Sequence, residues 1–162
     1  MRISTCASLA ALLWVATGAA SAEPPRGAEP TTATVQGAAQ LFLISLASGE
    51  LSRALDVLDE KVVIYESGAA EHSRAEYARE HLALDAAFLA RTKHKHLEHD
   101  VQEWGDRGMF LSRYEQSGEK DGKPFVVTGA TTMLLHKGDS GWRITHIHWS
   151  SHDQERLRCL SN

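Results

Sequence analysis

Apolar residues between positions 34 and 58 recur at the spacing of two helices. The first series stops just before Gly49, a residue type that commonly follows the last turn of a helix. Its members are Val35, Ala38, Ala39, Phe42 and Leu46. A second, shorter series consists of Leu51, Leu55 and Leu58. The pattern therefore predicts that the fold begins near Thr34 with one helix, followed by a second short one.

A strand and a well-marked helix come next. The segment KVVIYES, residues 61–67, is rich in β-branched and aromatic side chains, and Gly68 ends it. The motif SRAE, residues 73–76, is a capping box: the serine accepts a hydrogen bond from the glutamate amide, and the glutamate side chain reaches back. We expect a helix that begins at Ser73 and runs to about Arg91.

After residue 91 the hydrophobic period changes from 3.6 to 2, which is typical of strands. The intervening segments GDRG, SGEKDGKP and KGDSG have the composition of hairpin loops, so the strands should pair antiparallel in order. The four expected strands are His94–Glu103, Met109–Gln116, Phe125–His136 and Trp142–Ser150. Helices packed on one face of an antiparallel sheet make an α+β domain, and a cavity can form between the two layers.

The helix beginning at Ser73 carries polar groups among the apolar residues of one side. At helical spacing this side holds Tyr77, His81, Leu84, Asp85 and Phe88. A buried carboxylate without a partner is strongly unfavourable, so Asp85 must be paired, hydrated or less buried than the spacing suggests. His81 lies one turn away and is close enough to pair with it. The two residues are therefore candidates for a catalytic acid–base pair.

The last expected strand, WRITHIHWSS, places two imidazoles beside large apolar side chains. Strict alternation puts Trp142, Ile144, His146 and His148 on one face, and Thr145, Ile147 and Trp149 on the other. We expect the histidine-bearing face to look toward the helices, so that both layers line one cavity. Its candidate ligand-binding residues are Tyr65, Glu66, Tyr77, His81, Asp85, Trp142, His146 and His148.

Three interpretations of this cluster remain open. It can be a hydrogen-bonded polar network inside the core, or a pocket that orients a small ligand. It can also be a transition-metal site, because three neutral imidazoles and a carboxylate are suitable ligands for zinc or copper. The candidate metal ligands are His81, Asp85, His146 and His148.

The segment KHKHLEHD, residues 93–100, contains three further histidines. His94, His96, Glu98 and Asp100 alternate there with Lys95, Leu97, His99 and Val101. A solvated edge strand accounts for this composition, since charged side chains on an edge prevent unwanted pairing. A second, exposed metal site is the alternative.

The N-terminus has the pattern of a secretory signal peptide. Residues 1–22 combine Arg2, a short apolar run and a small-residue exit, with cleavage expected near Ala22/Glu23. The apolar run is shorter than the roughly 20 residues of a spanning helix, so we expect no membrane span and a periplasmic or secreted protein. Residues 23–33 read as a flexible leader, residues 34–152 as one domain, and residues 153–162 as a C-terminal tail.

Charge and motifs narrow the functional classes. The chain has 17 Lys and Arg against 21 Asp and Glu, a balance that does not supply the basic face needed to bind nucleic acid. It has no C-x-x-C, H-E-x-x-H, G-x-S-x-G or glycine-rich phosphate motif. After cleavage only Cys159 would remain, which rules out an intramolecular disulfide.

Two segments resemble a known superfamily. The run TGATTMLLHKGDSGWRITHIHWSS, with Trp142, His146, His148 and Ser150, is similar to the last two strands of SnoaL-like proteins of the nuclear transport factor 2-like, ketosteroid isomerase-like superfamily. YESGAAEHSRAEYAREHLALD is similar to the strand-to-helix segment of exported members. The resemblance covers residues 34–151.

The resemblance implies a fold and a general function. The fold is a cone of the cystatin-like type, in which N-terminal helices pack on a curved antiparallel sheet that encloses a pocket. The resemblance also implies a homodimer through the outer face of the sheet, with His146 and His148 lining the pocket. The superfamily contains isomerases, dehydratases, cyclases and proteins without activity, so the function it implies is a pocket for a small ligand.

Overall fold

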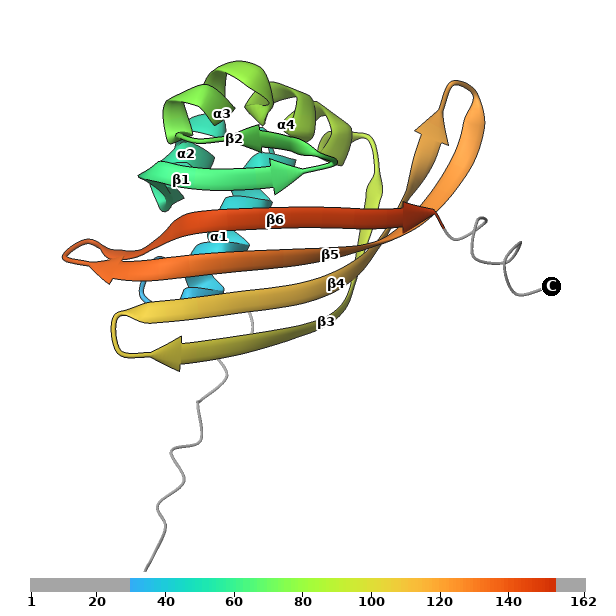
Figure 1. Cartoon of the computed structure of the whole chain (residues 1–162). Coiled ribbons are helices and arrows are strands. Elements are labelled where there is room, and N and C mark those ends of the chain that lie inside the picture. Colours follow the sequence, from blue (N-terminus) through green and yellow to red (C-terminus); the bar gives the residue numbers. More distant parts are fainter. Residues whose placement is uncertain (1–29, 154–162) are drawn as a thin grey trace, which may run out of the picture.

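The computed structural model describes residues 30–153, which form helices packed on one face of a curved, open sheet (Figure 1). The helices are α1 (Val35–Ala47), α2 (Leu51–Val57), α3 (Arg74–Glu80) and α4 (Leu82–Ala90). The strands are β1 (Leu58–Glu66), β2 (Ala69–Glu71), β3 (Lys93–Trp104), β4 (Arg107–Lys120), β5 (Lys123–Gly138) and β6 (Gly141–Asp153). The predicted α+β architecture is confirmed.

The sheet has the order β2-β1-β6-β5-β4-β3. Strands β3 to β6 form the expected antiparallel meander, whereas β1 pairs parallel with β6 and antiparallel with the short strand β2, which the sequence pattern did not predict. Helix α1 crosses behind the sheet, and the β4–β5 hairpin extends beyond it (Figure 1). Within residues 30–153, no helix is both long and apolar enough to span a membrane.

The core lies between α1 and the concave face of the sheet. Its fully buried large side chains are Trp142, Tyr77, Phe42, Leu46, Leu58, Ile64, Met133, Leu135, Ile144, Ile147, Val35 and Val57. Thr32, which precedes the predicted domain start at residue 34, already contacts the sheet: its carbonyl accepts a hydrogen bond from the Trp142 amide at 2.8 Å. The predicted signal peptide, most of the predicted leader and residues 154–162 of the predicted tail lie outside the described residues.

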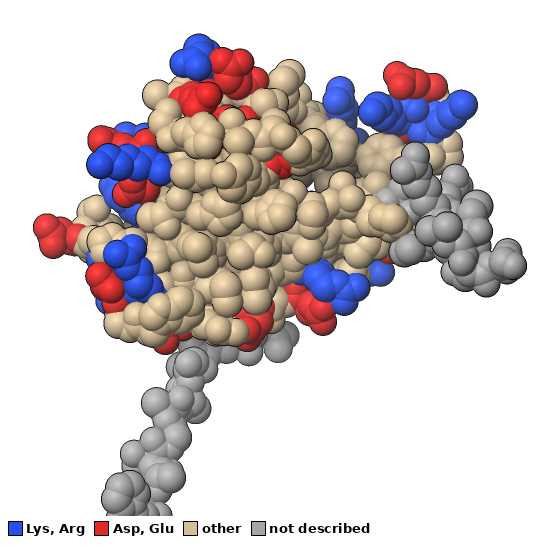
Figure 2. All heavy atoms as spheres, in the orientation of Figure 1, with Lys and Arg blue, Asp and Glu red and all other residues tan. Residues whose placement is uncertain are grey.

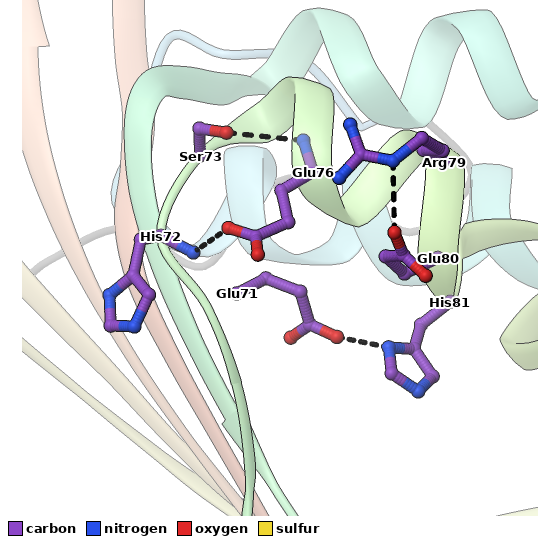
Figure 3. Close-up of polar contacts among 7 residues, drawn as sticks. All are labelled: Glu71, His72, Ser73, Glu76, Arg79, Glu80 and His81. Atoms are coloured by element: carbon purple, nitrogen blue, oxygen red, sulfur yellow. Dashed lines mark hydrogen bonds and ion pairs between the residues drawn. The ribbon is translucent and has the colours of Figure 1, made fainter.

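The capping box forms at the start of α3, as predicted. The Ser73 hydroxyl accepts from the Glu76 amide at 3.1 Å, and the Glu76 carboxylate accepts from the backbone N–H of His72 at 2.7 Å (Figure 3). Two of the free amides at the helix start are thus satisfied by side chains, which accounts for the position at which the helix begins.

The prediction of one continuous helix from Ser73 to Arg91 is wrong, because the chain leaves helical geometry at His81. That residue has φ −120° and ends α3, and α4 starts at the next residue. After the break, Asp85 and Phe88 still face the interior between helix and sheet, but Leu84 does not. Leu84, expected on the inner side, is 63% exposed, whereas Tyr77 before the break is fully buried.

A β-bulge at Thr145 reverses the two faces of β6. His146 pairs with Leu134 of β5, but the next residue of β5, Leu135, pairs with Ile144, so Thr145 has no partner of its own. Because side chains alternate with a period of two, one extra residue moves every later side chain to the opposite face.

The bulge corrects the expected orientation of the last strand. Before it, Trp142 and Ile144 are buried against the helices, as predicted. After it, Ile147 is buried and Trp149 lines the cavity between the layers, while His148 is exposed. The prediction that His146 and His148 face the helices is therefore wrong.

Replacing Gly129 by alanine should destabilise the protein. Gly129 pairs with Tyr114 across β4 and β5, and a Cβ atom there would overlap the tyrosine ring. We expect Gly129→Ala to lower the free energy of unfolding by about 1–3 kcal/mol, because the ring must shift. In Gly138→Ala, the added Cβ meets no atom within 4 Å, so a change below about 0.5 kcal/mol is expected. Urea denaturation measures the free energy of unfolding of both variants. Equal losses would contradict the explanation that the added Cβ atom displaces the Tyr114 ring.

Candidate functional site

A cavity of about 70 Å³ lies between the helices and the concave face of the sheet. Helices α1 and α4 form one wall and strands β3 to β6 the other, with the end of β1 between them. In Figure 2 the surface is hollowed between the main body and the β4–β5 hairpin, near the end of the helices. The lining residues are Leu43, Leu46, Glu66, Asp85, Phe88, Leu89, His94, Ser112, Tyr114, Gln116, Thr131 and Trp149.

Glu66 brings a carboxyl group into this largely apolar cavity. It is the last residue of β1 and pairs with Trp149 of β6, so the ladder places both on the concave side. Within the described part of the chain, its carboxylate has no hydrogen bond or ion pair. Burial, together with the nearby charge of Asp85, raises the pKa of Glu66 to about 7, and the charge of His81 opposes the shift only in part.

Asp85 is the second carboxyl group of the cavity, and it has a fixed partner. The hydroxyl of Tyr77 donates a hydrogen bond to Asp85 Oδ2 at 2.9 Å. Burial raises the pKa of Asp85, while this hydrogen bond and the charge of His81 oppose the increase. Tyr77 is itself buried beside these carboxylates, which raises its pKa, so the phenol stays protonated and acts as a donor.

His81 forms an ion pair with Glu71 and does not line the cavity. Its Nδ1 contacts Glu71 Oε1 in strand β2, and the Glu71 side chain is 5% exposed against 41% for His81 (Figure 3). A buried carboxylate requires a partner, and the imidazole supplies it. The predicted pairing partner of His81 was Asp85, but the structure gives each residue a different partner.

Tyr114 and His94 form the opposite wall of the cavity. Their rings stack with centroids 4.8 Å apart and an angle of 28°. Burial and the charge of Glu66 raise the pKa of Tyr114. Burial and the neighbouring His96 lower the pKa of His94. Both side chains therefore favour their uncharged forms, a phenol that can donate and an imidazole that can donate or accept.

Aromatic stacking holds the remaining walls. Trp149 stacks on Phe42 of α1 at 6.1 Å and 17°, and Phe88 of α4 stacks on Phe125 of β5 at 6.1 Å and 12°. The second pair connects the helical layer to the base of the extended β4–β5 hairpin. These contacts fix the separation of helix and sheet at the two ends of the cavity.

Apart from His81, which is paired with Glu71 outside the cavity lining, the predicted site residues divide into three groups. Glu66 and Asp85 line the cavity, and Tyr77 lies behind Asp85 as its hydrogen-bond donor. Trp142 is buried in the core, outside the cavity lining. Tyr65, His146 and His148 lie on the outer face of the sheet, where the rings of Tyr65 and His146 meet edge to face at 5.7 Å.

The predicted metal site does not form. His81 and Asp85 lie on the helical side of the sheet, whereas His146 and His148 are on the other side because of the bulge at Thr145. Within residues 30–153, no group of three or more His, Cys, Asp or Glu side chains is placed to hold a metal ion.

Several cavity residues were not predicted from the sequence, although some of them alternate at the spacing of a strand face. Ser112, Tyr114 and Gln116 alternate on β4, and that alternation could have marked a cavity wall once β4 was placed beside the helices. Trp149 was assigned to the outer face, because the bulge had no recognisable signal. His94 was interpreted as part of an exposed edge strand or of a second, exposed metal site, and not as a residue of this cavity.

Comparisons with known proteins agree with this geometry. Residues 35–154 match the family model of the SnoaL-like domain. A candidate ketosteroid isomerase from Shewanella frigidimarina NCIMB 400 is 32% identical, with a TM-score of 0.69, and the match covers 74% of this chain and 97% of that one.

More distant structures share the fold. A candidate calcium/calmodulin-dependent protein kinase II association domain from Xanthomonas campestris has 21% identity and a TM-score of 0.59, over 73% of this chain and 85% of that one. A nuclear transport factor 2-like protein with a cystatin-like fold from Novosphingobium aromaticivorans has 16% identity and a TM-score of 0.61, over 79% and 86%. Comparison with functionally curated proteins gives no significant match. The chain belongs to the SnoaL-like domain family and has the cystatin-like fold of the nuclear transport factor 2-like superfamily.

Proposed function

We propose that the protein binds a small organic molecule in the cavity and moves a proton on it with Glu66 as the base. One observation carries the proposal: a carboxyl group that has no hydrogen-bond partner among residues 30–153 faces a largely apolar cavity, and its pKa is raised to about 7. A general base works best when its pKa lies near the working pH, since it is then both unprotonated and sufficiently basic.

The size and lining of the cavity limit the ligand. About 70 Å³ is far below the roughly 300–1,000 Å³ of pockets that take drug-sized molecules, so the ligand is small. Phe88, Tyr114 and Trp149 offer ring surfaces, while Glu66 and Asp85 disfavour an anion. A small neutral carbonyl compound with an apolar body fits these conditions.

The proposed reaction is a proton shift next to a carbonyl group. The Glu66 carboxylate removes a proton from the carbon beside the carbonyl, and the electron pair moves onto the carbonyl oxygen. The Tyr114 phenol, which favours its protonated form, donates a hydrogen bond to that oxygen. Protonated Glu66 then returns the proton to another carbon, so the isomerised product has the same atoms as the substrate.

This proposal changes the assignment made from the sequence. The predicted acid–base pair was His81 and Asp85, but His81 is engaged with Glu71. We assign the base to Glu66, whose pKa is raised mainly by burial, while Asp85 with its Tyr77 donor adds a nearby negative charge that raises it further. The 32% identity to a candidate ketosteroid isomerase supports proton transfer as the reaction class.

Glu66→Gln should abolish proton transfer while leaving the fold intact. With small unsaturated ketones in D₂O, we expect the unmodified protein to exchange the protons beside the carbonyl, and the variant to do so about 10²–10⁴-fold more slowly. Proton NMR measures the exchange. Glu60→Gln is the matched control, since Glu60 lies on the same strand with its side chain 85% exposed, and it should retain full activity. Equal rates in both variants would rule out Glu66 as the base.

The same carboxyl group should make stability depend on pH. The ordinary pKa of Glu66 is 4.5 and the folded value is about 7, so between these values the folded state binds the proton more tightly and raising the pH destabilises it. Since Glu66 is only half-buried and water screens its charge, the loss should be on the order of 1 kcal/mol. Thermal unfolding should show that Glu66→Gln abolishes this loss of stability between pH 4.5 and 7, whereas Glu60→Gln retains it.

We also propose that the chain is exported and forms a homodimer through the outer face of the sheet. The pattern of residues 1–22 supports export. The outer face has few charged side chains except at its margins (Figure 2), and it exposes 46% of Tyr65 and 40% of Leu134. Exposed apolar side chains on a weakly charged surface are typical of a protein interface.

Native mass spectrometry of the protein from its host tests both ideas. We expect a mature chain that begins at Glu23 and a mass of twice that chain. Leu134→Glu should shift the species to monomer, because it buries a charge in the interface. Leu84→Glu is the control, since Leu84 is 63% exposed on α4, away from the sheet, and it should leave the dimer intact. A monomeric unmodified protein would contradict the proposed homodimer. An uncleaved N-terminus would contradict the proposed export.

A further inference from the structure

A second β-bulge, at Leu97, brings two histidines together on the edge strand β3. His96 pairs with Tyr114 of β4, but Glu98 pairs with the adjacent residue Arg113, so Leu97 has no partner of its own. As at Thr145, the extra residue reverses the alternation. Strict alternation had placed His96 and His99 on opposite faces, whereas the bulge puts both on the concave face.

Their positions in the ladder confirm this orientation. His99 pairs with Ser112, and His96 pairs with Tyr114; both partners line the cavity. His94, two residues before His96, lines the cavity itself. The histidines of β3 thus follow the rim of the cavity along one edge of the sheet.

The two rings are oriented toward one another. The Nδ1 atom of His99 lies 3.2 Å from the Nε2 atom of His96, and the ring centroids are 5.1 Å apart at an angle of 61°. The ring of His99 also stacks on Phe110 at 5.9 Å and 23°, which limits its rotation. Both histidines are exposed, so water and ions reach them.

The separation of the two nitrogens suits a shared metal ion. With metal–nitrogen bonds of about 2.0–2.1 Å, two ligands at one metal lie roughly 2.9 Å apart at 90° and roughly 3.4 Å apart at the tetrahedral angle. The observed 3.2 Å falls between these values. A hydrogen bond between the two rings also has this length, but on an exposed surface water competes with it and little stability results.

We propose that His96 and His99 form a two-imidazole site for a divalent transition metal, with Cu²⁺ the preferred ion and water in the remaining positions. Copper(II) heads the affinity series of the divalent first-row metals at nitrogen ligands, and it accepts two neighbouring imidazoles with solvent beside them. The described residues provide no third ligand, so the affinity corresponds to an exchangeable ion at the rim of the cavity.

The neighbouring charges do not oppose an ion there. Glu98 forms a 2.7 Å ion pair with Arg113, and both side chains belong to the opposite face of the sheet. The site does not include Glu66, so the proposed metal binding does not depend on the proposed proton transfer.

Titration with Cu²⁺ followed by electron paramagnetic resonance tests the site. We expect the unmodified protein to bind one copper ion at micromolar concentration, with hyperfine coupling to imidazole nitrogen. His96→Ala/His99→Ala should weaken binding at least tenfold, and its unfolding temperature should not change because both side chains are exposed.

A matched double variant controls for the number of histidines. His146→Ala/His148→Ala removes two imidazoles from the outer face of the same sheet, and it should bind copper as tightly as the unmodified protein. Undiminished binding in the His96/His99 variant, or loss of binding in the His146/His148 variant, would overturn the proposal.

A second measurement needs no substitution. When copper and ascorbate are added to the unmodified protein, histidines that hold the ion are oxidised first. Peptide mass spectrometry should find the added oxygen on His96 and His99 ahead of His136 and His148. Oxidation spread evenly over the exposed histidines would also overturn the proposal.

Discussion

The period-two alternation of a strand, and its interruption by single extra residues, controls the chemistry of this protein. The concave face must bury large apolar side chains against α1, and β6 satisfies that demand with Trp142 and Ile144 before the bulge and with Ile147 and Trp149 after it. Once these residues face inward, the residues between them have to face outward. The imidazoles of β6 are excluded from the cavity for this reason, and not because their own chemistry is unsuited to it.

The carboxyl groups in and beside the cavity differ in their hydrogen-bond and ion-pair partners. Glu66, Glu71 and Asp85 all lie near one imidazole, that of His81. Glu71 takes the imidazole as its partner, and Asp85 takes the hydroxyl of Tyr77. Glu66 is left without a partner among the described residues, and burial together with the charge of Asp85 raises its pKa to about 7. A group that is neither neutralised nor fully solvated is the one best placed to exchange a proton with a ligand.

The fold itself leaves the function open, since one architecture carries many activities. Here the particular side chains narrow the choice. A cavity with two carboxyl groups, a phenol that stays protonated and three ring surfaces favours a small uncharged molecule and proton transfer. The paired imidazoles of β3 lie at the rim of the same cavity.

Interactions between residues close in sequence were sufficient to predict most of the helices and strands. Helical spacing from Val35 to Leu46, the capping box at Ser73 and the alternation after residue 91 all correspond to elements of the structure. These signals arise between residues a few positions apart, and the sequence displays such neighbours directly. Asp85 could be named for the same reason, as a polar residue in an apolar helical stripe, and Glu66 because it lies at the end of a predicted strand.

Only the tertiary structure decided which side chains meet. The bulges at Leu97 and Thr145 arise from the pairing of β3 with β4 and of β6 with β5, and the break at His81 accompanies its contact with Glu71 on the unpredicted strand β2. Both bulges depend on residues in a neighbouring strand, and each reverses the side chains that follow. The sequence by itself determined the elements and their order, whereas the faces of those elements followed from long-range packing, because one added residue in a strand costs little locally but inverts every later position.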